Sequence, residues 1–264
     1  MKKAIVIGVI AVVIIGVILA FVLGGKADPI VIADDVLSNT ISETIIGYNV
    51  GQFMENEVRA EGHIILGKQQ KGKALHVYAL TMYGEYSFQD YCLVKVKGTE
   101  VVPALVKITQ NDEGEFFAEI EWPKEGKKYE KSVKKLIPEI YQERALNITQ
   151  SDTEELKKQE QYYAEKYLKE IKRKAEVVDF EDLEHKMLTT LGVSEEANKV
   201  VEEKYTQYPY WIGNKEIVEG ETRFVYETAY NVKRDKVVLT KYKYKEKDIL
   251  ERIILDGQTG EVNN

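Results

Sequence analysis

The chain has 264 residues, with 37 basic and 44 acidic side chains, and its formal net charge is −7. This acidic balance argues against a nucleic-acid-binding protein, which presents a basic face to the phosphate backbone. A single cysteine excludes a disulfide framework, a cysteine zinc finger and an iron–sulfur protein. Apolar and aromatic residues are frequent enough to form hydrophobic cores, so the composition excludes a wholly disordered chain.

The first predicted element is a transmembrane helix at residues 4–23, an apolar stretch without a charge. Twenty helical residues span about 30 Å, the thickness of the hydrocarbon core of a bilayer. Lys2 and Lys3 precede the stretch and several acidic residues follow it, so the positive-inside rule predicts a cytoplasmic N-terminus and an extracytoplasmic C-terminal bulk. The alternative is a signal peptide cleaved near residues 25–27, which would make the protein a secreted one.

The first ectodomain is predicted over residues 28–176. It begins with a helix over 33–48, where apolar residues recur at helical spacing. Glycine, asparagine and aspartate turn signals then separate five predicted strands, at 57–66, 74–83, 91–96, 101–109 and 115–122. Pro103 indicates that its strand lies at a sheet edge or contains a bulge, because proline has no N–H to donate to the hydrogen-bond ladder.

Helical periodicity replaces strand alternation after the fifth strand. A helix is expected over 132–146, interrupted at Pro138, and a longer helix is expected to run to about residue 174. Ser151 and Glu154 have the spacing of a capping box, in which a hydroxyl and a carboxylate satisfy free N–H groups at a helix start. We therefore predict that the longer helix begins at this box.

The second ectodomain is predicted over residues 177–264. Its first helix is expected at 180–191, ended by Gly192, and its second helix is capped by Ser194. Three strands joined by hairpin-length turns follow, at 222–232, 237–245 and 249–255. The predicted fold class is therefore α+β: an N-terminal transmembrane helix followed by two extracytoplasmic modules, each with helices packed on a small antiparallel sheet.

Motifs for nucleophilic or metal chemistry are weak in this sequence. Ser132-Val133-Lys134-Lys135 matches the S-x-x-K motif of penicillin-binding proteins, but no K-T-G follows it. His63, His76 and His185 lie on separate predicted elements and lack the H-E-x-x-H spacing of zinc peptidases. We assign these histidines ordinary structural roles, and we expect no catalytic residue, no metal and no cofactor.

Acidic residues give two further patterns, neither of which defines a site. Residues 256–261 have some of the residue types of a calcium loop without its ligand spacing, so a glycine-rich turn is the preferred interpretation. Carboxylates are abundant, but the sequence does not single out an acid/base pair. A cell-wall-active or other hydrolase with unidentified acidic residues therefore stays an alternative.

The candidate binding surface is the alternating run Lys241-Tyr242-Lys243-Tyr244-Lys245. In a strand, this run places two tyrosines on one face and three lysines on the other. One interpretation packs the tyrosines on the core and extends the lysine stems over apolar surface outside it. The other interpretation is a basic, aromatic-flanked surface for an anionic wall polymer or an acidic partner.

Residues 55–177 resemble the extracytoplasmic module of BlaR/MecR-type regulatory membrane metallopeptidases of Gram-positive bacteria. The segments that carry this resemblance are Glu61–Gly67, Val77–Tyr86, Trp122–Gly126, Ile137-Pro138, Leu156–Glu160 and Tyr167–Ile171. The multi-helix membrane portion and the H-E-x-x-H site of that family are lacking, so the resemblance does not imply proteolysis.

Residues 194–262 resemble a PepSY-type domain, a helix followed by a small antiparallel sheet. The resemblance depends on Ser194-Glu195-Glu196-Ala197 at the helix start and on Leu255–Val262 at the end. It implies inhibition of a protease or another protein contact.

These observations predict a non-enzymatic, single-pass membrane protein of a Gram-positive bacterium that senses or binds at the cell surface. Its partners would be the membrane, through the N-terminal helix, and a membrane or secreted protease or another envelope protein. A structural partner that assembles through Gly16 and Ala20 of the membrane helix is a further alternative. No oligomeric state is predicted.

Overall fold

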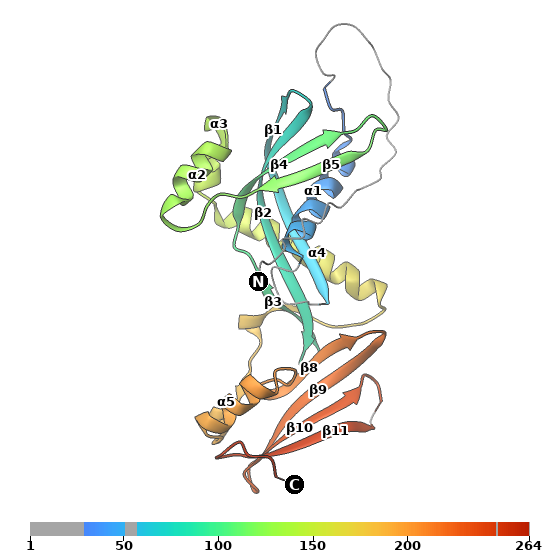
Figure 1. Cartoon of the computed structure of the whole chain (residues 1–264), viewed down its shortest axis with the longest axis vertical. Helices are drawn as coiled ribbons and strands as arrows, with labels where there is room; N and C mark the ends of the chain where they lie inside the picture. Colours follow the sequence, from blue (N-terminus) through green and yellow to red (C-terminus); the bar gives the residue numbers. More distant parts are fainter. Residues whose placement is uncertain (1–28, 51–56, 247, 264) are drawn as a thin grey trace, which may run out of the picture. The chain divides into compact units, whose positions relative to one another are not determined.

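The computed structural model describes residues 29–50, 57–246 and 248–263 (Figure 1). The predicted transmembrane helix at 4–23 lies outside these residues. Within the described ranges, no helix combines the length and the apolar character needed to cross a bilayer.

The predicted α+β class is confirmed, with a large, mainly antiparallel sheet and, in the part of the chain that is described, five α-helices. The described residues form two compact units. The first comprises residues 29–50, 59–84 and 97–163, and the second comprises 57–58, 85–96 and 164–263. Residues 85–96 and 164–176, which belong to the predicted first domain, therefore lie in the second unit.

A helix, five strands and three more helices follow one another up to residue 170. They are α1 (Asp34–Asn49), β1 (Val58–Lys71), β2 (Ala74–Gln89), β3 (Cys92–Gly98), β4 (Val102–Gln110), β5 (Phe116–Glu121), the 3₁₀ turn η1 (Gly126–Lys128), α2 (Tyr129–Leu136), α3 (Glu139–Leu146) and α4 (Gln150–Glu170). After residue 170 the chain forms β6 (Val177–Asp179), η2 (Phe180–Asp182), β7 (Lys186–Met187), η3 (Thr189–Leu191), α5 (Glu195–Lys204), β8 (Trp211–Glu219), β9 (Thr222–Asn231), β10 (Lys236–Lys243) and β11 (Ile249–Asp256).

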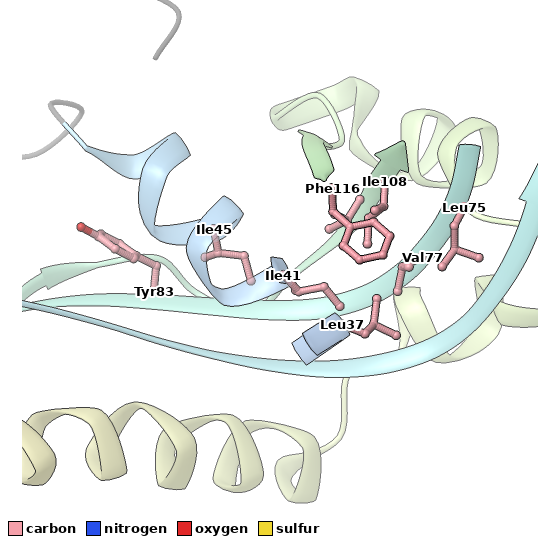
Figure 2. Packing of buried hydrophobic residues seen from close by; sticks show 9 residues of the cluster. Leu37, Ile41, Ile45, Leu75, Val77, Tyr83, Ile108 and Phe116 are labelled. Carbon is pink, nitrogen blue, oxygen red and sulfur yellow. The ribbon is translucent and has the colours of Figure 1, made fainter. Parts of the chain in front are cut away.

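One face of the first unit's sheet packs against α1. Leu37, Ile41 and Ile45 recur at helical spacing on α1, and all three are completely buried. Figure 2 shows them lying against side chains of β2, β4 and β5, namely Leu75, Val77, Ile108 and Phe116. Burial of an aliphatic or aromatic side chain of this size contributes about 1.5–3 kcal/mol to folding. This cluster therefore holds α1 on the sheet.

The alternate residues of β2 point to the other face, which α2, α3 and α4 cover. Tyr78 packs with Val133 of α2 in one cluster, while Leu80 and Met82 pack with Leu156 of α4 in another. The helix predicted over 132–146 is confirmed as two helices, because Pro138 separates α2 from α3.

The start of α4 differs from the prediction, because the capping box lies two residues earlier. The Thr149 hydroxyl donates to Asp152 Oδ2 at 2.7 Å, and the Asp152 N–H donates to Thr149 Oγ1 at 3.1 Å. Ser151 is an exposed residue inside the helix. The Asp152 carboxylate is buried and also accepts a hydrogen bond from Arg144 at 2.9 Å, so tertiary contacts decide between the two candidate boxes.

The prediction of a helix over 180–191 is wrong. The segment forms η2, β7 and η3 instead, although Gly192 does adopt the left-handed conformation expected of a terminating residue, with φ of 103°. The ring centroids of Phe180 and His185 lie 6.1 and 4.3 Å from that of Trp211. Packing on Trp211 therefore replaces the helical stripe that the apolar spacing indicated.

Four strands of the second unit follow one another in the large sheet in the antiparallel order β8–β9–β10–β11, drawn in orange to red in Figure 1. Ala197 and Val201 of α5 pack with Val237, Leu239 and Leu255 on one face of this sheet. The predicted cap of α5 is confirmed, since the Ala197 N–H donates to the Ser194 hydroxyl oxygen at 3.0 Å. The sequence patterns predicted β9, β10 and β11 but not β8.

The two candidate capping boxes can be separated by a pair of alanine substitutions. Thr149→Ala is expected to lower the free energy of unfolding by about 1 kcal/mol, because it removes the N-cap hydroxyl of α4. Ser151→Ala is the matched control and should change it by less than about 0.5 kcal/mol, because an exposed helix residue makes no cap. Urea denaturation measures both values. A larger loss for Ser151→Ala than for Thr149→Ala would contradict the observed box.

Candidate functional site

The face of the β8–β11 sheet opposite α5 carries a row of side chains across all four strands. The register places Glu216 of β8 beside Val225 of β9, Val225 beside Tyr242 of β10, and Tyr242 beside Ile249 of β11. Residues that pair in register point to the same face of a sheet. The row is therefore continuous from β8 to β11.

This row forms part of the floor of a groove of about 540 Å³. Tyr91 and Tyr244 add two aromatic rings to its lining, and Glu227 and Thr240 add the polar side chains of the next paired row. The groove therefore combines tyrosine rings and aliphatic side chains with carboxylates.

Tyr91 reaches the groove from the turn between β2 and β3. Asp90 and Tyr91 both have positive φ, 46° and 68°, which is unfavourable for a bulky residue such as tyrosine. The Asp90 carboxylate compensates by accepting hydrogen bonds from the Asn214 N–H at 2.7 Å and from the Trp211 indole at 3.1 Å. A Cβ on Gly213 would lie 2.1 Å from the Asp90 carboxylate, so only glycine allows this approach.

The predicted surface residues 241–245 are divided between the two faces. Tyr242 and Tyr244 line the groove, whereas Lys241 lies over the rings of Phe224 and Tyr226 at 4.3 and 4.9 Å. Phe224 and Tyr226 belong to the α5 side of the sheet. The tyrosines are thus on the groove face and not in the α5 core.

Carboxylates pair with two of the three lysines in this run. Lys241 Nζ lies 3.1 Å from Glu219, and Lys243 Nζ lies 3.6 Å from Glu246. Lys245 lies over the Tyr244 ring at 5.3 Å and lines the groove. The run therefore presents much less positive charge than its sequence indicates.

A cluster of buried charges supports the groove at Glu216. The Glu216 side chain is 1% exposed and accepts two hydrogen bonds from the Arg173 guanidinium, both of 2.6 Å. Arg223 donates to Glu216 at 3.3 Å and to Glu57 at 2.6 Å. Two-pronged pairing of this kind fixes both the position and the plane of each group.

Aromatic rings enclose the arginine of this cluster. The Arg173 guanidinium carbon lies 3.4 Å from the Phe88 ring centroid and 4.6 Å from that of Tyr244. Arginine favours such stacking because its charge is delocalised over a plane. The contact with Arg173 therefore holds the Tyr244 ring in position where it lines the groove.

Two tyrosine hydroxyls near the groove are held in their neutral form. Burial, and then a hydrogen bond to Glu227 at 3.0 Å, raise the pKa of Tyr242 above its ordinary value of 10. Burial and then the hydrogen bond to Glu57 raise the pKa of Tyr167 to about 12. Each hydroxyl donates to a carboxylate, so loss of its proton would place two negative charges together.

The three histidines have different surroundings. His185 packs against the rings of Phe180 and Trp211, and burial lowers its pKa, against the opposing charge of Asp90 and together with that of Lys215. Burial and then Lys71 lower the pKa of His76 on β2. Both rings are half-buried, and the structural roles assigned to them from the sequence stay predictions. His63 is different, because its two ring nitrogens bond to polar side chains beside a separate hollow.

The other sequence motifs have structural roles in this fold. The Ser132 hydroxyl donates to the Tyr129 carbonyl at 2.7 Å and accepts from the Lys124 N–H at 2.8 Å. Asp256 accepts from the N–H groups of Gln258 and Thr259 at 3.0 and 3.1 Å, which closes the C-terminal turn. Among the residues that the structure describes, no group of three His, Cys, Asp or Glu side chains could hold a metal ion.

Only Tyr242, Tyr244 and Lys245 of the groove lining belong to the surface predicted from the sequence, so Tyr91, Glu216 and Ile249 were among the residues missed. Tyr91 lies in a turn, Glu216 lies on the strand that was not predicted, and only the register of β10 with β11 brings Ile249 to Tyr242. The prediction had placed Tyr91 at the start of the strand expected at 91–96, whereas the structure has it in the turn before β3.

No family model, curated protein or solved structure matches the chain. The resemblances to the BlaR/MecR-associated module and to PepSY-type domains therefore stay predictions.

The buried charge cluster makes a strong prediction for stability. Glu216→Gln is expected to lower the free energy of unfolding of the second unit by about 3–5 kcal/mol, because Arg173 keeps a buried charge without its partner. Glu203→Gln is the matched control. Its exposed pair with Lys199, at 3.7 Å, should contribute less than about 1 kcal/mol. Urea denaturation measures both, and equal losses for the two variants would contradict the role of the cluster.

The Tyr242–Glu227 contact predicts a pH effect. Because the folded-state pKa of Tyr242 is raised, its hydroxyl should stay protonated as the pH passes 10, and its contribution to stability should fall as the pH rises further. Glu227→Gln should move the pKa back toward 10, whereas the control Glu219→Gln, on the other face, should leave it unchanged. Carbon-13 NMR titration of labelled tyrosine, assigned with Tyr242→Phe, measures this. An ordinary pKa in the unsubstituted protein would refute the contact.

Proposed function

We propose that this protein is an extracytoplasmic binding protein of the cell envelope, and that its groove binds an extended polypeptide segment of another envelope protein. The observation that carries the proposal is the set of exposed apolar side chains at the groove, beside an open strand edge. Tyr91 and Ile249 line the groove and are 69% and 54% exposed, and Leu250, the next residue of β11, is also 54% exposed. Apolar side chains gathered in this way are typical of protein contact sites.

The strand edge supports a polypeptide as the occupant. Among the described strands, β11 ends the order of the second unit's sheet. Residues 249–252 of β11 are all exposed, while Leu255 is paired with Val262 at the other end of the strand. An exposed edge can pair with an added strand, whose alternate side chains then enter neighbouring pockets. Ile249 lies both on this edge strand and in the groove lining.

The charges around the groove favour a polypeptide over an anionic wall polymer. Lys241 and Lys243 are paired with carboxylates, and Glu227 and Glu246 also line or border the groove. These carboxylates would repel a polyanion, whereas they would not repel an apolar side chain placed between Tyr91 and Ile249. We assign no bond-breaking step to this groove, because Glu216 is committed to the two arginines and Glu227 to Tyr242.

The cellular location is part of the proposal. The uncharged stretch 4–23 with Lys2 and Lys3 before it supports a single-pass anchor with a cytoplasmic N-terminus. The PepSY-type resemblance of residues 194–262 supports a membrane or secreted protease of a Gram-positive bacterium as the class of partner.

Photo-crosslinking in intact cells tests this proposal. A photoreactive amino acid in place of Tyr91 is expected to give one discrete adduct with an envelope polypeptide, and protease added outside the cells should digest it. The same amino acid in place of Val232, which is 67% exposed in the β9–β10 turn, is the matched control and should give no such adduct.

A second variant tests the groove itself. Ile249→Asp should lower the yield of the Tyr91 adduct by about tenfold or more, since a charge replaces an apolar contact, while Val232→Asp should leave the yield unchanged. Equal yields from the two photoreactive positions, or an adduct that resists external protease, would refute the proposal.

A further inference from the structure

The first unit contains a hollow of about 470 Å³ beside the His63 ring. It is lined by Ser38 of α1, Glu61 and His63 of β1, and side chains of α4 that include Lys158, Gln159 and Tyr162. All these residues belong to the first unit, so the hollow is separate from the groove.

Gly62 brings α4 close to the strand that carries this site. A Cβ on Gly62 would lie 2.5 Å from the Leu156 carbonyl oxygen, so any other residue would push α4 away. The Gln159 side chain, from the same helix, accepts a hydrogen bond from the His63 N–H at 2.9 Å. Glu61 and His63 flank Gly62, and alternation directs their side chains to the opposite side of the strand.

The side chains of Ser38, His63 and Glu61 form a chain of hydrogen bonds. His63 Nδ1 lies 3.1 Å from Glu61 Oε2, and His63 Nε2 lies 3.2 Å from the Ser38 hydroxyl oxygen. A carboxylate only accepts hydrogen bonds, so in the neutral ring Nδ1 carries the proton. Nε2 is then free to accept the Ser38 proton. This order of serine, histidine and carboxylate is that of an activated nucleophile.

The carboxylate of this chain is rigidly held. Glu61 is 0% exposed, and its Oε1 accepts a hydrogen bond of 2.6 Å from the Ser42 hydroxyl. The Ser42 oxygen also lies 3.3 Å from the Tyr163 hydroxyl of α4. Glu61 is therefore fixed by α1 as well as by His63, whereas Ser38 is only half-buried and faces the hollow.

We propose that Ser38 is a nucleophile for acyl transfer from small esters, with His63 as its general base and Glu61 as the residue that positions His63. This proposal goes beyond the binding function of the second unit and departs from the expectation of a non-enzymatic protein. Geometry of this kind is the first requirement for a base, whose nitrogen must lie within about 2.6–3.2 Å of the oxygen atom that gives up the proton.

The reaction balances with water as the only co-reactant. Ser38 Oγ forms a bond to the ester carbonyl carbon and its proton passes to His63 Nε2; the ester C–O bond then breaks and the alcohol leaves with that proton. Water next attacks the acyl carbon, gives a proton to His63, and the Ser38 Oγ–acyl bond breaks as that proton returns to Oγ. The products are one alcohol and one carboxylic acid.

The helical position of Ser38 limits the source of oxyanion stabilisation. Residues inside a helix use their N–H groups in the helix itself, so the Ser38 N–H does not provide the backbone oxyanion hole of a serine hydrolase. The positive charge of Lys158 and the hydroxyl of Tyr162 line the same hollow and can take that role. We therefore expect slow turnover of activated esters.

The experiment uses the purified full chain with p-nitrophenyl acetate and with a fluorophosphonate probe. Release of p-nitrophenolate, and a probe adduct located on Ser38 by peptide mass spectrometry, are expected. Ser38→Ala should lower the rate by about 100-fold or more and abolish the adduct, because both steps need the hydroxyl. Ser132→Ala is the matched control, since Ser132 is also half-buried but bonds to backbone groups, and it should keep the full rate.

Glu61→Gln tests the positioning role separately. It should lower kcat by about 100-fold with little change in KM, because the amide does not hold the required histidine tautomer; a purely structural loss would lower the melting temperature without this split. Absence of a Ser38 adduct in the folded protein, or equal rates for Ser38→Ala and Ser132→Ala, would overturn the proposal. The groove proposal is unaffected by either result, because its crosslinks arise from Tyr91.

Discussion

The alternation of side chains along paired strands is the constraint on which both units depend. In the first unit, successive residues of β2 face α1 on one side of the sheet and α2–α4 on the other. Each of these side chains therefore packs in the hydrophobic core on one side of the sheet or on the other. In the second unit, α5 takes one face and leaves the other for the groove row at Glu216, Val225, Tyr242 and Ile249. A slip of one residue in β10 would exchange the two faces, turning Tyr242 toward α5 and Lys241 toward the groove. The register therefore determines the groove as much as the residue types do.

Both candidate sites contain a nearly inaccessible carboxylate, but the compensation differs. Glu216 is neutralised by Arg173 and Arg223, and removal of a charge from water costs several kcal/mol per ion unless such partners are present. Glu61 has instead a serine hydroxyl and a histidine ring, which leave the second ring nitrogen free to bond outward. In the first arrangement both oxygens of the Glu216 carboxylate are bonded to arginines, so Glu216 has a structural role beneath the groove. In the second, Glu61 orients His63, and His63 in turn bonds to the Ser38 hydroxyl, which is the arrangement that activates a nucleophile.

Local patterns in the sequence predicted the elements that depend on local physics. The stripe of α1, the order of the strands β1 to β5 and the Ser194 cap were correct, because periodicity and capping chemistry act over a few residues, whereas β1 and β2 extend to residues 71 and 89, beyond their predicted ends. The box at Ser151 was wrong because a contact with Arg144 stabilises the alternative, and the helix at 180–191 was wrong because its aromatic residues pack on Trp211. Tyr242 and Tyr244 were found as an unusual run. Ser38 and His63 were not paired, because 25 residues separate them and only the packing of α1 on β1 brings them together.

Close approach permitted by glycine is the feature that the two sites share. At Gly213 the missing Cβ admits the Asp90 carboxylate, which fixes the strained turn and so holds Tyr91 out over the groove. At Gly62 it admits the backbone of α4, which lines the hollow and satisfies the His63 N–H through Gln159. In each case an added Cβ would lie within 2.5 Å of an oxygen atom, a separation that requires the neighbouring group to move. Alanine at Gly213 would displace the Asp90 carboxylate, and alanine at Gly62 would displace the backbone of α4. Because each displaced group belongs to a candidate site, we expect either substitution to disturb that site more than the core of its unit.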